Sequence, residues 1–273
     1  MVLGLSEPVL RGASFAAVLV AMAMAEALWP RRRLTLPRAA RWRTNGALVV
    51  FDTLMVRVLA QTAAPFAAVA VAAFAGARGF GLLNMIVAPT WAKMIAAFLL
   101  LDLAVWAQHV AFHRIGVLWR FHAVHHADRD IDVTTALRFH PGEIAVSALY
   151  KSAVVLALGP PVVAVIVFEI ALNACAMFNH ANVALPAWLD RALRPLIVTP
   201  DLHRIHHSTD PREHNANFGF CLSVWDRLFG KFIAQPAAGH HGMTIGLAAL
   251  QTAAPARLVW SLRAPFAFPA RDS

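Results

Sequence analysis

The amino-acid sequence predicts an all-α membrane protein: a polytopic bundle of about four spanning or hairpin helices with a histidine-rich dimetal cap facing the cytosol. Three observations predict this fold class. The 273 residues are 59% apolar and 14% charged, with a mean hydropathy of +0.59, which is too apolar for a water-soluble domain of this size. Apolar runs of about twenty residues, the length that crosses a bilayer core, recur along the chain. Most of the 13 histidines fall in motifs with helical spacing.

The net charge of +9 does not indicate nucleic-acid binding. The arginines gather at the ends of apolar runs instead of forming one stripe, and aromatic or glycine-rich RNA-binding motifs are absent. Anionic lipid head groups are therefore the expected partner of this charge. Cys175 and Cys221 form neither a disulfide framework nor a C-x-x-C motif, so we expect two free thiols, which suits a catalytic part that faces the cytoplasm.

The first apolar run, residues 9–29, has the length of a membrane span. It resembles a signal peptide, but its start carries little positive charge and six arginines follow it directly. By the positive-inside rule these arginines hold that end in the cytoplasm and place the N-terminus outside. The run is therefore predicted to be a retained anchor helix. The six are Arg31, Arg32, Arg33, Arg38, Arg41 and Arg43.

The next two runs bring the chain across the membrane again. Residues 46–77 are long for one span and contain Pro65, so they form either one kinked, tilted helix or a helix plus a short broken segment. Residues 84–89 are too short to cross and are expected to be an interfacial link. Residues 91–112 start with a tryptophan suited to the interface and return the chain toward the cytoplasm.

Asp102 lies within this third run, two helical turns before His109 and on the same face. A carboxylate inside a membrane helix needs a partner. One expectation is a hydrogen bond to the far nitrogen of a metal-binding histidine; the other is an ion pair with Arg57 or Lys93.

The second half of the chain contains a hairpin and a surface segment. Residues 144–158 and 162–178 flank Gly159-Pro160-Pro161, a break that predicts a helical hairpin dipping from the cytoplasmic side. Residues 186–200 mix apolar and charged side chains and are expected to lie on the membrane surface. In the tail, His240 and His241 lack ligand spacing and are interpreted as surface residues.

The histidine motifs have a chemical interpretation. Histidines four apart on a helix present two imidazoles to one point, and an H-x-x-H-H motif presents three in the same way. The H-x-x-H-H motif occurs twice, some eighty residues apart. A lone histidine is more often a satisfied core residue, but three such motifs in one chain favour a metal site. Imidazole suits iron, copper, nickel and zinc, and a metal accepts few such ligands, so eight predict two metals. They are His109, His113, His122, His125, His126, His203, His206 and His207.

Further residues are candidates near this site. His180 follows the hairpin at the level where the other histidines should lie, and His140 is either a further ligand or the cap of the helix that begins at Pro141. Asn179 and Asp201 stand beside ligand motifs and, with Asp102, are expected to support the ligands from behind.

The order of the motifs along the chain is more specific than any one motif. H-x-x-x-H is followed by L-W-R-F leading into H-x-x-H-H, then Asn179-His180, the second H-x-x-H-H, N-F-G and W-D-R-L-F-G. Over about residues 95–232 this set resembles the fatty acid hydroxylase/sterol desaturase superfamily. The resemblance implies a membrane enzyme with a histidine-ligated di-iron centre that uses dioxygen and two electrons to hydroxylate or desaturate a lipid.

The chain departs from that superfamily in two respects. Fatty acid hydroxylases tend to carry a further H-x-x-x-H ending where His180 stands, but its first position here is Ala176, so one ligand is missing or is supplied by His140 or His214. No cytochrome b5-like domain is present, so electrons are expected from a separate ferredoxin, cytochrome b5-like protein or reductase. The expected organisation is N-terminal transmembrane anchor helices over 1–94, a catalytic domain over 95–235 and a C-terminal interfacial tail over 236–273.

Oxidation of an unactivated C–H bond requires redox-active iron, although zinc can substitute at the same ligands. Two other functions remain open: a non-catalytic membrane protein that holds zinc, and a lipid metallohydrolase, for which mixed histidine and carboxylate ligands would be expected. The sequence leaves the lipid (fatty acyl, sterol-like or other isoprenoid) and the oligomeric state open. An arginine-to-lysine ratio of 21 to 3 suggests a G+C-rich bacterial source and hence the inner membrane.

Overall fold

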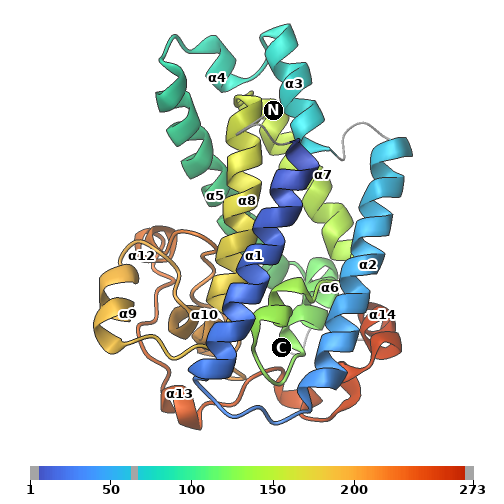
Figure 1. Cartoon of the computed structure of the whole chain (residues 1–273), viewed down its shortest axis with the longest axis vertical. Coiled ribbons are helices and arrows are strands. Elements are labelled where there is room, and N and C mark those ends of the chain that lie inside the picture. Colours follow the sequence, from blue (N-terminus) through green and yellow to red (C-terminus); the bar gives the residue numbers. More distant parts are fainter. Residues whose placement is uncertain (1–5, 63–66, 268–273) are drawn as a thin grey trace.

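The computed structural model describes residues 6–62 and 67–267. Long helices form an elongated bundle that stands on a cap of short helices and loops (Figure 1). Within the described residues there is no β-strand, only three isolated bridges. The all-α prediction is thus confirmed.

Four long helices correspond to predicted apolar runs. Their length follows from the membrane, where each backbone group must be satisfied within the helix. The breaks between them also lie where predicted: Gly159 has the left-handed φ of 59°, which ends one arm of the hairpin, and Pro161 caps the other. These helices are α1 (Glu7–Leu28), α5 (Thr90–Arg114), α7 (Pro141–Leu158) and α8 (Val162–His180).

The second apolar run is divided between helices, as one of the two interpretations expected. α2 (Arg38–Thr62) ends before Pro65, which lies outside the described residues, and α3 (Ala68–Arg78) follows. α4 (Leu82–Met85) then links α3 to α5. Gly81, at the start of α4, packs against the hairpin so closely that a Cβ there would lie 2.4 Å from the Gly159 nitrogen. The link is therefore seated on the tip of the hairpin.

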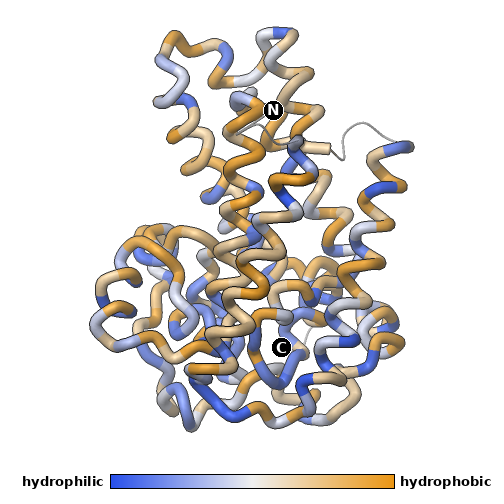
Figure 2. Tube along the Cα trace, viewed as in Figure 1, coloured by the Kyte–Doolittle hydropathy of each residue, from blue (hydrophilic) through white to orange (hydrophobic). Residues whose placement is uncertain are grey.

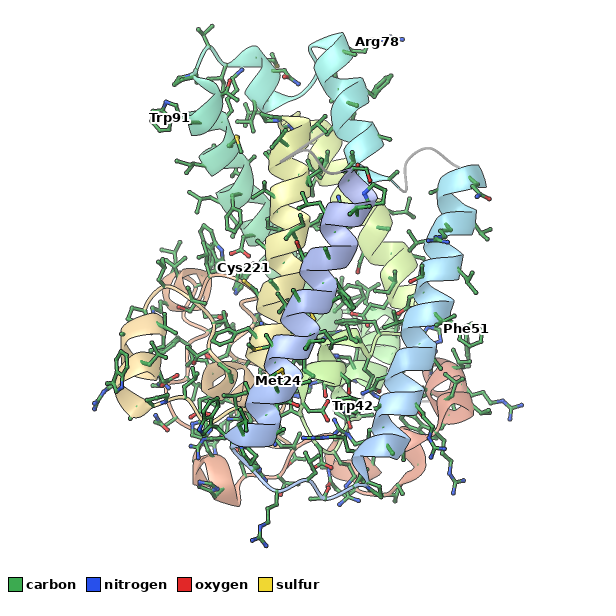
Figure 3. The ribbon with its side chains drawn as sticks, viewed as in Figure 1. Met24, Trp42, Phe51, Arg78, Trp91 and Cys221 are labelled. Carbon is green, nitrogen blue, oxygen red and sulfur yellow. The ribbon has the colours of Figure 1, made fainter. Side chains whose placement is uncertain are left out.

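Among the described residues, five segments are long and apolar enough to cross a membrane, against about four expected: α1, α5, α7, α8 and residues 68–85. The last comprises α3 and α4, and the eleven residues of α3 span only about 16 Å, half of a bilayer core. Apolar residues dominate the bundle, whereas the cap mixes apolar and hydrophilic residues, the latter gathered at its end away from the bundle (Figure 2). Trp91 and Arg78 lie at the end of the bundle remote from the cap, whereas Trp42 lies near the cap (Figure 3).

The cap gathers the short elements around the ends of α5 and α8. Its α9 is the amphipathic segment expected on the membrane surface, and Trp188 in it is 66% exposed. The other elements are α6 (Gly116–His126), η2 (Val133–Leu137), α10 (Pro200–His206), α11 (Pro211–His214), α12 (Val224–Leu228), α13 (Gly239–Gly242), η3 (Ala248–Leu250), η4 (Ala254–Ala256) and α14 (Leu258–Ala267); α9 is Ala187–Leu193.

Two buried arginines connect the cap to the bundle. Arg41 of α2 donates to both oxygens of Asp128 at 2.7 and 2.8 Å and also pairs with Asp132, so it orders the loop after α6. Arg138 donates to the Val124 carbonyl at 2.8 Å and to the Pro255 carbonyl at 2.6 Å. The C-terminal part of the described chain is thereby held against α6, where α14 also packs.

Candidate metal centre

Nine histidines meet where α5, α6, α8 and α10 converge inside the cap. Each is buried, with at most 9% of its surface exposed. Their ligand atoms form two groups in which all members lie within 4.8 Å of one another. The first group is His109, His113, His122, His126 and His206; the second is His125, His180, His203 and His207.

The sequence predicted that each H-x-x-H-H motif presents three imidazoles to one point, and this prediction is wrong. His122 and His126 join the first group, whereas His125 joins the second. Residues four apart on a helix point in nearly the same direction, but the residue between them is rotated by about 60° from the first. The motif in α10 splits in the same way, so each motif contributes to both groups.

Within each group the Nε2 atoms face one another at the spacing of ligands on a shared ion. The Nε2–Nε2 distance is 3.1 Å between His109 and His122, 3.0 Å between His206 and His109, and 3.1 Å between His180 and His125. Two nitrogens bound at about 2.1 Å to one metal are about 3.0 Å apart at a right angle and about 3.4 Å apart in a tetrahedron. The nitrogen pairs of both groups therefore have the right-angle spacing and not the wider tetrahedral one.

In five of the nine rings a hydrogen bond holds the opposite nitrogen, whereas Nδ1 is buried without a partner in the described chain in His113, His126, His203 and His207. Nδ1 of His109 donates to the Phe218 carbonyl at 2.7 Å, and Nδ1 of His206 donates to the Ala216 carbonyl at 2.8 Å. Nδ1 of His180 likewise lies 2.7 Å from the carbonyl one turn earlier in α8. A carbonyl only accepts, so these rings carry their proton on Nδ1 and present an Nε2 lone pair.

Lone pairs facing each other at 3 Å have no hydrogen to share and need a cation between them. A donor set made only of imidazole nitrogens suits divalent iron, zinc or copper and not magnesium or calcium. Burial lowers the pKa of the cap histidines well below the usual value near 6.5, so they are neutral and ready to bind a metal at pH 7. The nine residues therefore fit two transition-metal ions.

The two candidates for an additional ligand lie in different places. His140 caps α7, since its Nδ1 accepts from the Gly142 N–H at 2.9 Å, and it belongs to neither group. His214 lies beside the first group, with ring centroids 4.8 Å from His113 and 4.5 Å from His126. Its Nδ1 is buried without a partner in the described chain, and burial lowers its pKa to about 4.

The residues expected to support the ligands bind elsewhere. Asp102 accepts hydrogen bonds from the Trp225 Nε1–H at 2.8 Å and from two backbone N–H groups of the 221–225 loop. Two helical turns separate it from His109 by about 10 Å, too far for a bond even on one face. Asn179 donates to the Phe220 carbonyl at 3.0 Å, and Asp201 pairs with Arg31 at 3.1 Å. These three residues order the loops around the centre instead of holding a ligand histidine.

The residues that do hold the ligand histidines in place were not predicted from the sequence. Glu143 accepts from His122 Nδ1 at 2.7 Å from the first turn of α7. Asp226 of the W-D-R-L-F-G motif accepts from the N–H of Phe218 at 2.9 Å and from Trp106 Nε1 at 2.8 Å, and so positions the carbonyl that binds His109. An acidic residue at the start of an apolar helix was the available signal for Glu143.

A cavity of about 570 Å³ extends from the metal centre into the bundle, between α1, α2, α3, α7 and α8. Of the nine clustered histidines, His109 and His122 line it, and apolar side chains make most of its remaining wall. Its remote part is lined by Arg11, Lys151 and Glu169, and both cations form ion pairs with Glu169. The size and lining are those of a small-molecule or lipid-chain site.

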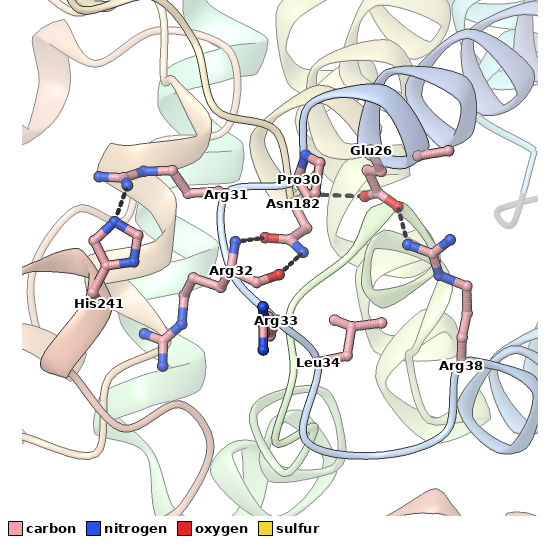
Figure 4. Close-up of a pocket in the computed structure, with 10 residues that line it drawn as sticks. Glu26, Pro30, Arg31, Arg32, Arg33, Leu34, Arg38, Asn182 and His241 are labelled. Atoms are coloured by element: carbon pink, nitrogen blue, oxygen red, sulfur yellow. Dashed lines mark hydrogen bonds and ion pairs between the residues drawn. The ribbon is translucent and has the colours of Figure 1, made fainter.

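A second cavity, of about 890 Å³, lies at the polar face of the cap and is lined by Arg31, Arg32, Arg33 and Arg38 (Figure 4). His241 reaches it through a 2.8 Å contact with Arg31. His240 was expected at the surface, but it is buried with 7% exposure, 3.5 Å from the Asp201 carboxylate. The sequence interpretation was wrong there because the tail folds back under α10.

The profile of the fatty acid hydroxylase family matches residues 94–231, half of the chain, and this segment contains both groups of histidines. The chain belongs to the fatty acid hydroxylase family. It is similar to the alkylglycerol monooxygenases of Danio rerio (32% identity over 152 residues, 54% of this chain) and Homo sapiens (30% over 159 residues, 57%). It is also similar to the ornithine lipid hydroxylase OlsE of Rhizobium tropici (30% over 151 residues, 53%).

These alignments cover 32%, 33% and 43% of the respective relatives, so the chain matches less than half of the length of each. No solved structure is significantly similar to the chain.

Proposed function

We propose that this protein hydroxylates a membrane lipid with dioxygen and two electrons at a di-iron centre held by the nine clustered histidines. The observation that carries the proposal is the pair of adjoining groups of buried histidines whose ring nitrogens converge, with members of each group held from behind through Nδ1. Bound iron would supply the redox chemistry that C–H oxidation needs, which zinc at the same nitrogens lacks.

The chain itself would bind and orient the substrate. The apolar cavity that ends at His109 and His122 is suited to a lipid segment, which would displace water from the centre when it binds. The relatives are named as hydroxylases or monooxygenases of alkylglycerols and ornithine lipids, which favours hydroxylation over desaturation and a polar lipid as substrate.

We place the cap in the bacterial cytoplasm, with the bundle in the inner membrane. The arginines of the α1–α2 loop lie at the cap end of the bundle, as the positive-inside rule requires of a cytoplasmic end. A separate, acidic electron-donor protein would dock at the cavity that these arginines line, because their charges complement its own. The cavity is linked to the metal centre through Arg31, which pairs with Asp201, two residues before His203. The division into anchor (1–94), catalytic part (95–235) and tail (236–273) is part of the same proposal.

The test is metal content and turnover of detergent-purified protein expressed with added iron. About two iron atoms per chain are expected, together with incorporation of ¹⁸O from ¹⁸O₂ into added alkylglycerol or ornithine lipid in the presence of a reductant. His125→Ala should lose both properties. His241→Ala is the matched control, because that histidine is exposed and lies outside both groups; with a chemical reductant, which does not need the donor-docking cavity, it should retain both.

Three results would contradict the proposal. Tightly held zinc that ferrous iron cannot replace would favour a structural site. Lipid turnover without oxygen or reductant would favour a metallohydrolase. Full activity of His125→Ala would separate activity from the histidine groups altogether.

A further inference from the structure

Two carboxyl groups from different helices face the cavity beside the metal centre. Asp52 comes from α2 and Glu143 from α7, and both line the cavity together with His122. The two helices pack against each other along this cavity. Each has an oxygen that is fully buried and unpartnered, Oδ1 of Asp52 and Oε2 of Glu143. Glu143 uses its other oxygen to hold His122.

Asp52 is the more isolated of the two. It is only 9% exposed and makes no hydrogen bond or ion pair within the part of the chain that the structure describes. Its neighbour Phe51 points outward from α2 and is 46% exposed (Figure 3), so the α2 backbone turns Asp52 toward the cavity. A buried carboxyl oxygen without a hydrogen-bond donor is unfavourable, and no contact within the described residues offsets this cost.

The basic residues that line the cavity are already engaged. Lys151 and Arg11 both bind Glu169, and Arg11 also binds Glu7. Lys151 is eight residues after Glu143 on α7, about 12 Å along the helix. The cavity therefore has unpaired acceptors at the metal end and a self-neutralised ion cluster at the remote end.

We propose that Asp52, with the free oxygen of Glu143, binds a hydrogen-bond-donating head group of the lipid substrate, a hydroxyl or an ammonium. This inference rests on the proposed function, and it names the class of substrate. A donor head group satisfies both free oxygens, whereas a hydrocarbon or ester satisfies neither and a carboxylate head group is repelled.

The position of the subsite determines which bond would be oxidised. Because Glu143 bonds directly to His122, a head group held between Asp52 and Glu143 lies next to the first histidine group. The carbons nearest the head group, not the distal end of the chain, are then placed beside His109 and His122. The alkyl chain occupies the apolar remainder of the cavity.

The experiment compares binding of three lipids with the same alkyl chain: a 1-O-alkylglycerol, an alkylamine and a fatty acid methyl ester. Binding is measured as the ligand-dependent rise in Tm of the zinc-loaded protein in detergent, which requires no turnover. The variants are Asp52→Leu and Asp52→Asn. Thr53→Val is the matched control, since Thr53 lies on the same helix and lines the same cavity.

We expect wild type and Thr53→Val to prefer the two donor-bearing lipids over the ester. Asp52→Leu should lose that preference, with affinity for the donor-bearing lipids falling roughly 10- to 100-fold and affinity for the ester unchanged. Asp52→Asn separates the two donors: it should retain the alkylglycerol within a few-fold and lose the alkylamine if the group bound is an ammonium. Without ligand, Asp52→Leu should melt at or above the wild-type Tm, because an unpaired buried carboxyl is removed.

Two outcomes overturn the inference. Equal binding of all three lipids by wild type and Asp52→Leu would mean that cavity water satisfies Asp52. An equal loss for all three lipids, with a lowered Tm in the absence of ligand, would mean that Asp52 is structural. If the donor-bearing lipids bind through Asp52 but the iron-loaded protein does not oxidise them, the proposed function fails and the binding inference stands.

Discussion

Removing the carboxylate of Glu143 should weaken metal binding at the first histidine group by about 10- to 100-fold. Its Oε1 lies 2.7 Å from Nδ1 of His122, and the two side chains are only 5% and 2% exposed. Alanine leaves the buried Nδ1–H of His122 without an acceptor, so its ring can rotate or change tautomer. A hydrogen bond to a charged group contributes about 1.5–3 kcal/mol, and about 1.4 kcal/mol corresponds to tenfold. Glu143→Gln keeps an acceptor but not the charge and should show a smaller loss.

The assay is chelator competition on zinc-loaded protein, which reports affinity without requiring turnover. Ser147→Ala is the matched control: Ser147 lies one turn further along α7, lines the same cavity and bonds only to Gln108, at 3.0 Å, among the hydrogen bonds of the described chain. It should bind zinc like wild type. Wild-type affinity in Glu143→Ala would refute the reasoning, because it would show that His122 needs no acceptor behind it.

Two further predictions concern the cap. Arg41→Leu leaves Asp128 and Asp132 buried without their cation and should lower the free energy of unfolding, measured by denaturation in detergent, by about 3–5 kcal/mol. The control is Arg43→Leu, which should change this free energy little because Arg43 is exposed. Equal effects of the two substitutions would contradict the role given to Arg41. The metal-free protein should lose stability as pH falls below about 6.5. Burial depresses the pKa of the cap histidines, so the unfolded chain binds more protons than the folded one, and each such histidine lowers the free energy of unfolding by about 1.4 kcal/mol per pH unit. A flat Tm between pH 7.5 and 5.5 would contradict this prediction.

The bundle was predictable because a membrane reduces helix prediction to run length and composition. The ends of α1, α5, α7 and α8 fall within a few residues of the apolar runs, since only a helix satisfies each backbone group in lipid. The partners of buried polar residues were not predictable in this way. Asp102 was placed correctly on its helix, but its bonds go to a loop more than a hundred residues later in the chain, which no local spacing encodes.

The histidine motifs show the same division between local and tertiary information. Spacing alone selects all of the clustered histidines except His180, and helix geometry also explains how the motifs divide. In each H-x-x-H-H the first and last histidines share a group, while the middle one turns to the other. The two motifs cross over, since His125 serves the group of His203 and His207, and His206 serves the group of His122 and His126. α6 and α10 must therefore pack in one register for either group to form. Each helix holds part of both groups, so displacement of either helix disturbs both metal sites.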